Sequence, residues 1–437
     1  GVIGPVMRGF KTSIESPFNL KLGQMACINC GQCIAACPTG ALHEKDSTKE
    51  VWDLLADPKK HVVVQPAPAV RAALGEEFGL PIGTRVTGKM TQALRRLGFD
   101  KVFDTDFGAD LTIMEEATEL LGRIQNGGVL PMITSCSPGW INYAEYNYPD
   151  LLPHLSSCKS PQQMQGAIIK SYYAEKNGID PKNIFMVSIM PCTAKKFEKE
   201  RPELEVDGIR DVDAVLTTRE LGSIIRRAGI QFEKLPDEDF DNDIIGEYSG
   251  AGALFGVTGG VMEAALRTVY HILTGKEREA ITFESVRGFE GVREASIKIN
   301  DLTVNVAIAH GMKNAKVLLD EIRAGTSKYH FIEIMGCPGG CINGGGQPIV
   351  RPCFLPHEDR DILDTYLQKR ARALYREDER QVLRQSHNNP QIIQLYKDYL
   401  GEPNSHLAHK LLHTTYTPKE KYSDPVTSPD PIPNFLP

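Results

Sequence analysis

The chain has 437 residues, enough for two or three folding units at roughly 150 residues per domain. Its 49 basic and 56 acidic residues give a net charge of −7, which argues against nucleic acid or an anionic membrane surface as a partner. No apolar run approaches the ~18 residues that a membrane span needs. The composition, with 41% hydrophobic residues, is that of a globular protein.

The cysteines are the most informative residues. There are ten, six of them in two tight clusters, at positions 27, 30, 33, 37, 136, 158, 192, 337, 341 and 353. Disulfide scaffolds are typical of short secreted chains, whereas this chain is long and shows no secretory signal pattern. We therefore expect metal or redox chemistry in a reducing, cytoplasmic compartment. Because the chain begins with Gly1 rather than Met, we also expect a processed terminus or a fragment of something longer.

The first cluster has the spacing of half a bacterial 4Fe-4S ferredoxin, Cys27-x2-Cys30-x2-Cys33-x3-Cys37-Pro38. In two-cluster ferredoxins the fourth cysteine of such a run ligates the other cluster. Three cysteines would then need a fourth ligand from upstream sequence, and Cys37 would serve a second cluster. If no second quartet lies upstream, the four cysteines form one site by themselves. Residues 1–50 are predicted to be a partial, small α+β ferredoxin-like domain.

Strands and helices alternate after residue 50. Hydrophobic periodicity predicts strands at 61–65, 101–103, 130–134 and 184–190, and helices at 89–97, 113–124 and 160–175. This alternation predicts an α/β fold whose parallel or mixed sheets are flanked by helices and carry their chemistry beyond the carboxyl ends of strands. Cys136 and Cys192 each follow a predicted strand. We predict a two-lobed catalytic domain over 51–360, wrapping helices over 361–415 (at 362–384 and 391–400) and a disordered tail over 416–437.

The second cluster lies in a glycine-rich segment near the end of the catalytic domain. Cys337 and Cys341 stand among six glycines between Met335 and Pro348. Spacing of four would put both thiols on one face of a helical turn, and glycine lets the backbone approach a bulky inorganic cluster. The alternative is a glycine-rich turn with two structural cysteines. Two thiolates are too few for a cubane, so further ligands are sought at Cys192 and in residues 134–140.

Three segments together resemble the active-site signatures of the iron-only, or FeFe, hydrogenases. They are TSCSPGW (134–140), MPCTAKKFE (190–198) and FIEIMGCPGGCINGGGQP (331–348), in the order that family has them, with similarity from about residue 20 to about 415. The resemblance implies 4Fe-4S clusters and an H-cluster, in which a cubane is bridged through a cysteine to a diiron centre with CO, cyanide and an azadithiolate. It implies Cys192 and Cys337 as cubane ligands and Cys341 as the bridge.

One position departs from the family pattern. Members commonly read Thr-Ser-Cys-Cys-Pro, in which the first cysteine relays protons and the second ligates the cubane, but here Cys136 is followed by Ser137. A hydroxyl is a poor iron ligand because it loses its proton less readily than a thiol. Three alternatives remain: Cys136 rotates in and ligates, leaving Ser137 or water in the relay; Ser137 ligates weakly and Cys136 relays; or the site is impaired. From the sequence we favour the first.

The resemblance also assigns a proton path and a pocket lining. Glu116, Glu119 and Arg123 share one face of the predicted helix 113–124, which from the residues alone reads as a solvated face. By resemblance these three and Ser156 carry protons from the surface to the active site. The implied pocket residues are Ala67, Pro68, Gln162, Met190, Met335 and Lys195. The role of Lys195 has the clearest physical reason, since the attraction between its cation and an anionic cyanide is stronger at a low dielectric constant.

The remaining motifs are expected to be structural. The segment 246–256 fits no phosphate-loop pattern and suggests tight packing near the site. Cys158 and Cys353 are expected to be ordinary thiols. His406, His409 and His413 are expected to form a surface face.

The resemblance predicts reversible reduction of protons to H2. Electrons would come from ferredoxin or a partner subunit, and maturation proteins would install the diiron centre. The alternatives are a low-activity sensory hydrogenase and a non-catalytic, hydrogenase-like iron–sulfur assembly protein. Lys195, Glu116, Glu119 and Ser156 argue against the last, because an assembly factor has no need of proton-relay and pocket residues.

Overall fold

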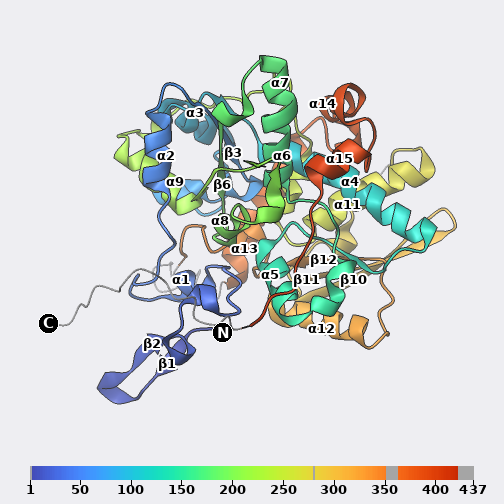
Figure 1. Ribbon diagram of the computed structural model, residues 1–437, viewed down its shortest axis with the longest axis horizontal. Helices are drawn as coiled ribbons and strands as arrows, with labels where there is room; N and C mark the ends of the chain where they lie inside the picture. The colour runs from blue at the N-terminus through green and yellow to red at the C-terminus, as the bar shows by residue number, and fades with distance from the viewer. Residues whose placement is uncertain (1, 279–280, 351–362, 422–437) are drawn as a thin grey trace.

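The structure is a computed structural model that describes residues 2–278, 281–350 and 363–421. Two four-stranded sheets occupy the centres of two lobes, and helices cover both (Figure 1). The predicted class, an α/β fold with parallel and mixed sheets flanked by helices, is confirmed. No helix within these ranges is long and apolar enough to cross a membrane.

The first sheet is parallel throughout. Its strand order is β4 (Lys101–Val102), β3 (His61–Pro66), β6 (Ile184–Met190) and β9 (Ala214–Thr217). The predicted strands 61–65, 101–103 and 184–190 match these bounds to within one residue. β3 and β6 are buried over nearly their whole length, which explains why they read as continuous apolar runs. The helices packed into this core include α2 (Thr48–Leu55), α3 (Thr87–Leu97) and α9 (Thr218–Arg227).

The second sheet is mixed. β10 (Val292–Ile299) and β11 (Leu302–His310) are antiparallel, and β12 (Phe331–Met335) and β5 (Met132–Ile133) continue the sheet in parallel. One face packs on α11 (Gly260–Thr274), and the other on α5 (Pro138–Asn147) and α12 (Met312–Arg323). The predicted strand 130–134 is reduced to β5, two residues at the end of the sheet.

The long helix α4 (Thr105–Asn126) joins the two lobes. Phe107 and Leu111 pack in the core of the first lobe, and Ile113 and Leu120 in the core of the second. The sequence predicted only 113–124, because the first two turns are buried on every side and show no amphipathic period. Asp104 caps the start of the helix by accepting a hydrogen bond from the Asp106 backbone N–H.

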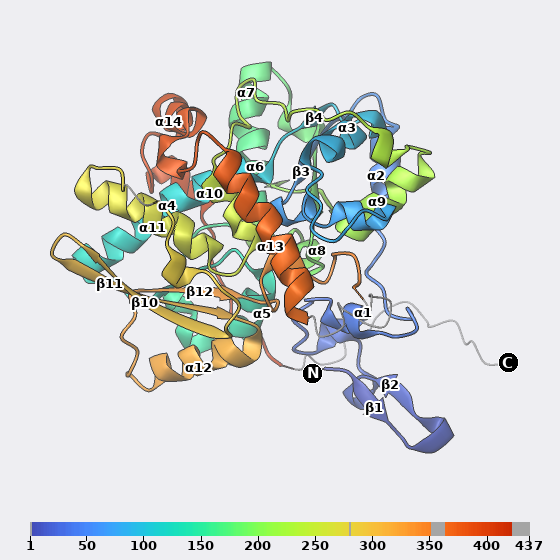
Figure 2. The same cartoon turned by 180° about the vertical axis from the view of Figure 1, so that it is seen from behind.

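Other predicted helices are present with altered bounds. The predicted helix 160–175 is α6 (Pro161–Ile168), a π-helical turn (Ile169–Tyr173) and α7 (Ala174–Asn177) in succession. The helix predicted at 362–384 is α13 (Leu363–Arg380). The helix predicted at 391–400 is α14 (Pro390–Leu395) followed by the π-helical turn Tyr396–Leu400. α13, α14 and α15 (His406–Leu412) lie against the outside of the lobes, where Figure 2 shows α13 and α14 and Figure 1 shows α15. Cys353 and most of the predicted tail lie outside the described residues.

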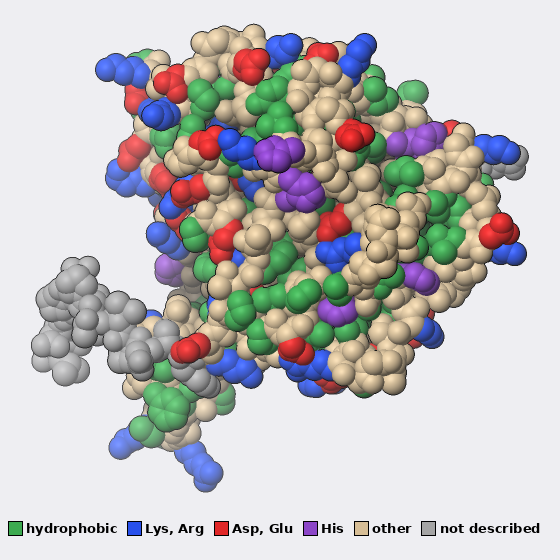
Figure 3. All heavy atoms as spheres, turned by 45° about the vertical axis from the view of Figure 1, so that its right-hand side comes forward, with side chains coloured by type: hydrophobic (Ala, Val, Ile, Leu, Met, Phe, Trp, Pro, Cys, Tyr) green, Lys and Arg blue, Asp and Glu red, His purple; other side chains and the backbone are tan. Residues whose placement is uncertain are grey.

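The amino-terminal segment stands apart from the lobes. The hairpin of β1 (Gly4–Val6) and β2 (Ser13–Glu15) projects outward, while α1 (Gln32–Ala36) lies against the body (Figure 1). A second small hairpin, β7 (Glu205–Val206) and β8 (Ile209–Arg210), lies within the first lobe's sequence. Acidic and basic side chains are interspersed on the face seen in Figure 3.

The glycine-rich segment 246–256 packs tightly, as predicted. It forms α10 (Gly250–Ala253), where a Cβ on Gly252 would lie 2.7 Å from the Asp106 carbonyl oxygen of α4. Only glycine allows this backbone approach. The segment therefore holds the start of α4 in place and brings Phe255 towards the junction of the lobes.

Candidate active site

The three signature loops follow the carboxyl ends of three strands. Cys136 and Ser137 lie between β5 and α5, and Cys192 lies between β6 and α8 (Ala194–Glu198). Cys337 and Cys341 follow β12. The two sheets thus present the predicted site residues to one place, as parallel strand ends do in α/β folds.

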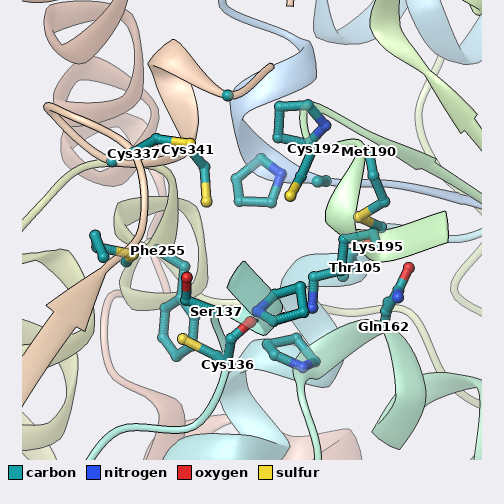
Figure 4. Close-up of a pocket in the computed structure, with 18 of the residues that line it drawn as sticks. Thr105, Cys136, Ser137, Gln162, Met190, Cys192, Lys195, Phe255, Cys337 and Cys341 are labelled. Carbon is teal, nitrogen blue, oxygen red and sulfur yellow. Dashed lines mark hydrogen bonds between the residues drawn. The ribbon is translucent and has the colours of Figure 1, made fainter. Parts of the chain in front are cut away.

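A largely apolar cavity collects these loops (Figure 4). Cys192, Cys337 and Cys341 line it together with Lys195, Gln162 and a set of mostly apolar residues that includes Ala67, Pro68, Ala109, Met190, Phe255 and Met335. Burial first, and then the neighbouring Cys192 thiol, raises the pKa of Cys341 to about 12. Bare thiols in such surroundings stay protonated, so a cationic metal centre is what would hold them as thiolates. The donor set therefore fits an iron–sulfur cofactor.

The helical turn predicted for Cys337 and Cys341 is wrong. The intervening Gly339 and Gly340 have φ values of 79° and 96°, which break any helix between the two thiols. A Cβ on Gly340 would lie 2.7 Å from the Thr258 backbone nitrogen. The glycines allow close backbone approach as predicted, but the contacts that the structure shows are to other chain segments.

Cys136 and Ser137 face different neighbours across the cavity from Cys192 and Cys341 (Figure 4). The Ser137 Oγ accepts a hydrogen bond from the Gly336 backbone N–H at 3.1 Å, directly before Cys337. Burial raises the pKa of the Cys136 thiol well above its usual value, with Glu116 adding to the shift and Lys195 opposing it. Cys136 therefore lies within electrostatic range of the predicted proton path.

Lys195 is held by a carboxylate that the sequence analysis did not single out. Its Nζ donates to Glu198 Oε1 and Oε2 at 3.1 and 3.0 Å and to the Cys136 carbonyl at 3.1 Å. Glu198 also accepts from Gln162 Nε2 at 2.5 Å and from Ser160 Oγ at 2.9 Å. The i,i+3 spacing of Lys195 and Glu198 was the available signal. Gln162 Oε1 is buried without a hydrogen-bond partner among the described residues, so a ligand in the cavity could pair with it.

The four predicted proton-path residues lie in one row. Arg123 Nη2 donates to Glu119 Oε1 at 2.6 Å, and Ser156 Oγ donates to Glu119 Oε2 at 2.9 Å. Ser156 also hydrogen-bonds Glu116. Burial, and then the charge of Glu119, raises the pKa of Glu116 to about 8. Exposure falls along the row, from the partly exposed Arg123 to Glu116, which is 2% exposed. The row leads from the surface towards Cys136.

The amino-terminal cysteines form a second group beside the cavity. Cys27, Cys30 and Cys33 lie within electrostatic range of one another, and burial raises the pKa of Cys30. Cys37 instead hydrogen-bonds Thr39, which lowers its pKa to about 6. Gln32 Nε2 lies 3.4 Å from Cys337 Sγ, so this group adjoins the active-site cysteines.

The predicted surface face of histidines is wrong for His413. His406 and His409 are exposed, but His413, the residue after α15, is buried. Its backbone forms an isolated antiparallel β-bridge with that of Cys158. Its ring nitrogens lie 3.0 Å from Glu115 Oε2 and 2.8 Å from Ser157 Oγ. Cys158 is a buried thiol, as expected.

Comparison with known proteins identifies the family. The protein-family model described as iron only hydrogenase large subunit, C-terminal domain, matches residues 60–345. Those for the iron hydrogenase small subunit and for a 4Fe-4S binding domain match residues 364–419 and 23–43. The cofactor prediction of 4Fe-4S clusters and an H-cluster is confirmed at the level of this family.

Curated relatives and solved structures agree. The chain is 51% identical to the NADP-reducing hydrogenase subunit HndD of Solidesulfovibrio fructosivorans, covering 96% of this chain and 71% of that protein. It is also 51% identical to iron hydrogenase 1 of Clostridium pasteurianum, and the match covers 87% of this chain and 65% of that protein. A cytosolic Fe-S cluster assembly factor of Danio rerio is 30% identical, covering 89% and 96%.

An apo variant of the FeFe hydrogenase HydA1 from Chlamydomonas reinhardtii has the same fold, with a TM-score of 0.74, 46% identity, and coverage of 86% of this chain and 100% of that one. The large-subunit match spans well over half of the chain, and its signature loops converge on one cysteine-lined cavity. The chain belongs to the iron-only, or FeFe, hydrogenase family.

Proposed function

We propose that the chain is an oxidoreductase acting on H2, which reversibly reduces protons with electrons from ferredoxin or a partner subunit. Cys192, Cys337 and Cys341 would hold an H-cluster in the cavity, with Cys136 or Ser137 as the fourth contact. When bound, the H-cluster supplies the iron at which H2 is made or split. Maturation proteins would install its diiron part.

The row of protonatable side chains that ends at the cavity carries this proposal. With a pKa of about 8, Glu116 is mostly protonated at neutral pH and can pass a proton towards Cys136. Ser156 and Glu119 can refill it through their hydrogen bonds, and Arg123 holds Glu119 at the outer end. A chain that only carries clusters has no use for such a row.

The cavity wall suits a cofactor with anionic ligands. Glu198 fixes the Lys195 ammonium through two hydrogen bonds, so the cation is oriented before any ligand binds. The apolar lining excludes water and strengthens the interaction of this ammonium with a negative group. Lys195 would thereby orient the cyanide-bearing part of the cofactor.

Electrons would enter through the amino-terminal cysteine group. Cys27, Cys30 and Cys33 would bind a 4Fe-4S cluster with one further ligand, and Gln32 connects this group to Cys337. Cys37 contacts Thr39 and would serve a second cluster. We expect the protein to work in the cytoplasm with a soluble electron donor.

A second candidate function is that of a low-activity sensory hydrogenase. The observation that favours it is Ser137, which stands beside Cys337 where a thiol is common in the family. A weakly held cubane would lower turnover without removing H2 binding. The relatives that are assembly factors are about 30% identical to this chain. If the chain shared their function, it would show no H2 chemistry.

Replacing Glu116 by Gln tests the proposal. With reduced methyl viologen, the matured wild-type chain should evolve H2, and the variant should be slower by about 100-fold or more, because an amide cannot relay a proton. Iron content should be unchanged. The matched control is Glu175→Gln, an exposed carboxylate in the first turn of α7. Equal rates for wild type and Glu116→Gln would remove Glu116 from the path, and no H2 from either protein would contradict the proposed activity.

A further inference from the structure

A second cluster of potential metal ligands lies away from the cysteine-lined cavity. It consists of His271 in the last turn of α11, Glu277 just after that helix, and His387 in the turn that precedes α14. One ligand atom from each lies within 4.8 Å of the other two. None of the three lines the active-site cavity or belongs to the proton row.

Both imidazoles converge on the same carboxylate oxygen. His271 Nδ1 lies 3.0 Å from Glu277 Oε1, and His387 Nε2 lies 3.1 Å from it. The two rings stack, with centroids 4.1 Å apart and planes 17° from parallel. Two bulky side chains from distant parts of the sequence are thus held side by side, and one nitrogen of each ring lies close to the same carboxylate oxygen.

Neighbouring polar groups fix the orientation of the cluster. The other nitrogen of the His387 ring, Nδ1, lies 3.1 Å from Thr268 Oγ1 on α11. The amides of Gln385 and Asn388 donate to Glu277 at 2.5 and 3.2 Å. Hydrogen bonds of this kind, to the far side of a histidine and to a carboxylate, typically orient metal ligands.

One of the candidate ligand atoms lacks a hydrogen-bond partner. His271 Nδ1 is buried and has no well-aligned hydrogen bond in the described residues, despite its closeness to Glu277. A cation between the three groups would satisfy this nitrogen.

We propose that His271, Glu277 and His387 form a binding site for a divalent transition-metal ion of the zinc type. Two imidazoles and one carboxylate are a common ligand set for Zn²⁺ and its first-row neighbours, with the remaining position left to water. The side chains of His271 and Glu277 are 36% and 46% exposed, so an ion can reach the site from solvent.

The site would join two segments that separate family models describe. His271 and Glu277 belong to the segment matched by the large-subunit domain, and His387 to the segment matched by the small subunit. An ion bound by all three would tie α11 to the chain entering α14. Because the unfolded chain does not hold these residues together, the ion would stabilise the folded state and the attachment of the carboxyl-terminal helices.

A different group, Glu119, Cys158 and His413, also has three ligand types close together. It is less suited to an ion, because the Arg123 guanidinium already pairs with Glu119 at 2.6 Å and would repel a second cation. Its removal therefore serves as a control for zinc binding elsewhere in the protein.

Zinc binding to the cluster-loaded protein tests the proposal. Zn²⁺ is added in small molar excess, iron content and visible absorption confirm that the clusters stay intact, and bound zinc is counted after gel filtration. We expect wild type to retain one equivalent and to unfold at a higher temperature with zinc than without. His271→Gln and Glu277→Gln should each lose that equivalent and the thermal shift. Both side chains are partly exposed, so these variants should fold.

Two control variants define the alternative outcomes. Cys158→Ala and His406→Gln, an exposed histidine on α15, should keep the bound equivalent. The proposal is overturned if wild type retains no zinc, or if His271→Gln and Glu277→Gln bind as much as wild type. Loss of zinc only in Cys158→Ala would place the ion at the Glu119 group instead and would equally overturn it.

Discussion

At the edge of the cavity, the neighbouring residues Cys136 and Ser137 make separate contacts. Ser137 accepts a hydrogen bond from the backbone next to Cys337, while Cys136 lies in the field of Glu116 at the inner end of the proton row. These contacts support Cys136 as the last proton carrier and Ser137 as the weak fourth contact of the cubane. The rotation of Cys136 that the sequence favoured stays a prediction, and it would cost the proton row its final member.

Cys136→Ala separates the two alternatives. If Cys136 relays protons, the variant should keep its full iron content while H2 turnover falls by about 100- to 10,000-fold, the usual range for losing a proton-transfer group. Iron per chain and H2 evolution are the measurements. Ser137→Cys is the matched variant and should bind the cubane at least as firmly as wild type. A loss of four irons per chain in Cys136→Ala would show that Cys136 is the ligand.

The titration of Glu116 gives a dependence on pH. Its folded pKa is about 8, above the ordinary 4.5, so the folded state holds a proton that the unfolded chain releases. Through this group stability falls as pH rises from about 4.5 to about 8. Glu116→Gln should flatten that part of the curve of unfolding free energy against pH, as measured by urea denaturation. An unchanged curve would mean that Glu116 is not protonated in the folded protein.

The sequence identified residues whose chemistry is local. The cysteines and their spacing predicted cluster ligands in the cavity. The three-and-four spacing of Glu116, Glu119 and Arg123 predicted only a shared helix face, and the family resemblance supplied the proton path. Glu198 was not singled out, although its spacing from Lys195 was visible, because its contact with Gln162 joins distant parts of the chain. His413 was placed on the surface because its contact with Glu115 is equally distant in sequence. The role of a carboxylate or an imidazole cannot be predicted from the sequence until the residue that it contacts is known.

At the scale of elements, the close contact between two loops sets the position of the amino-terminal cysteines. Gly345, in the loop after β12, packs on the turn that begins α1. A Cβ on Gly345 would lie 2.2 Å from the Cys30 carbonyl oxygen and 2.6 Å from the Gly31 Cα. Both obstacles are backbone, so they can move only if the two loops separate. This contact holds the first cysteine group beside Cys337.

Gly345→Ala should therefore weaken both the packing and the electron path. We expect about 1–3 kcal/mol less stability, as for other overpacked sites, and slower H2 evolution when reduced ferredoxin is the donor. Urea unfolding and ferredoxin-driven turnover are the measurements. Gly122→Ala, on α4 where a Cβ meets nothing within 4 Å, is the control and should unfold no more easily than wild type. Wild-type stability and rate in Gly345→Ala would show that the loop contact is not needed.

Element positions were predictable where burial is one-sided or where a strand is apolar throughout. The bounds of β3 and β6 followed from their apolar runs, and α3 from its amphipathic period. The start of α4 was missed because both lobes bury it. The turn between Cys337 and Cys341 was misread because a spacing of four between two cysteines does not reveal the positive φ values of the glycines between them.

At the scale of the whole molecule, two sheets meet at their carboxyl ends and the cavity lies at this junction. Cys136, Cys337 and Cys341 come from the second lobe and Cys192 and Lys195 from the first, so the proposed ligand set is complete only when both lobes are folded and joined by α4. Strand–helix alternation predicted the class of fold. Which strand ends meet depends on the packing between lobes, which no local pattern encodes.

The infrared spectrum of the matured chain tests most directly whether this cavity holds an H-cluster. Co-expressed with the maturation proteins, wild type should show bands of iron-bound CO and cyanide, and Lys195→Ala should shift or lose the cyanide bands because the oriented ammonium is gone. A wild-type spectrum without such bands, from protein whose 4Fe-4S iron content is normal, would contradict the hydrogenase assignment and favour a chain that carries iron–sulfur clusters alone.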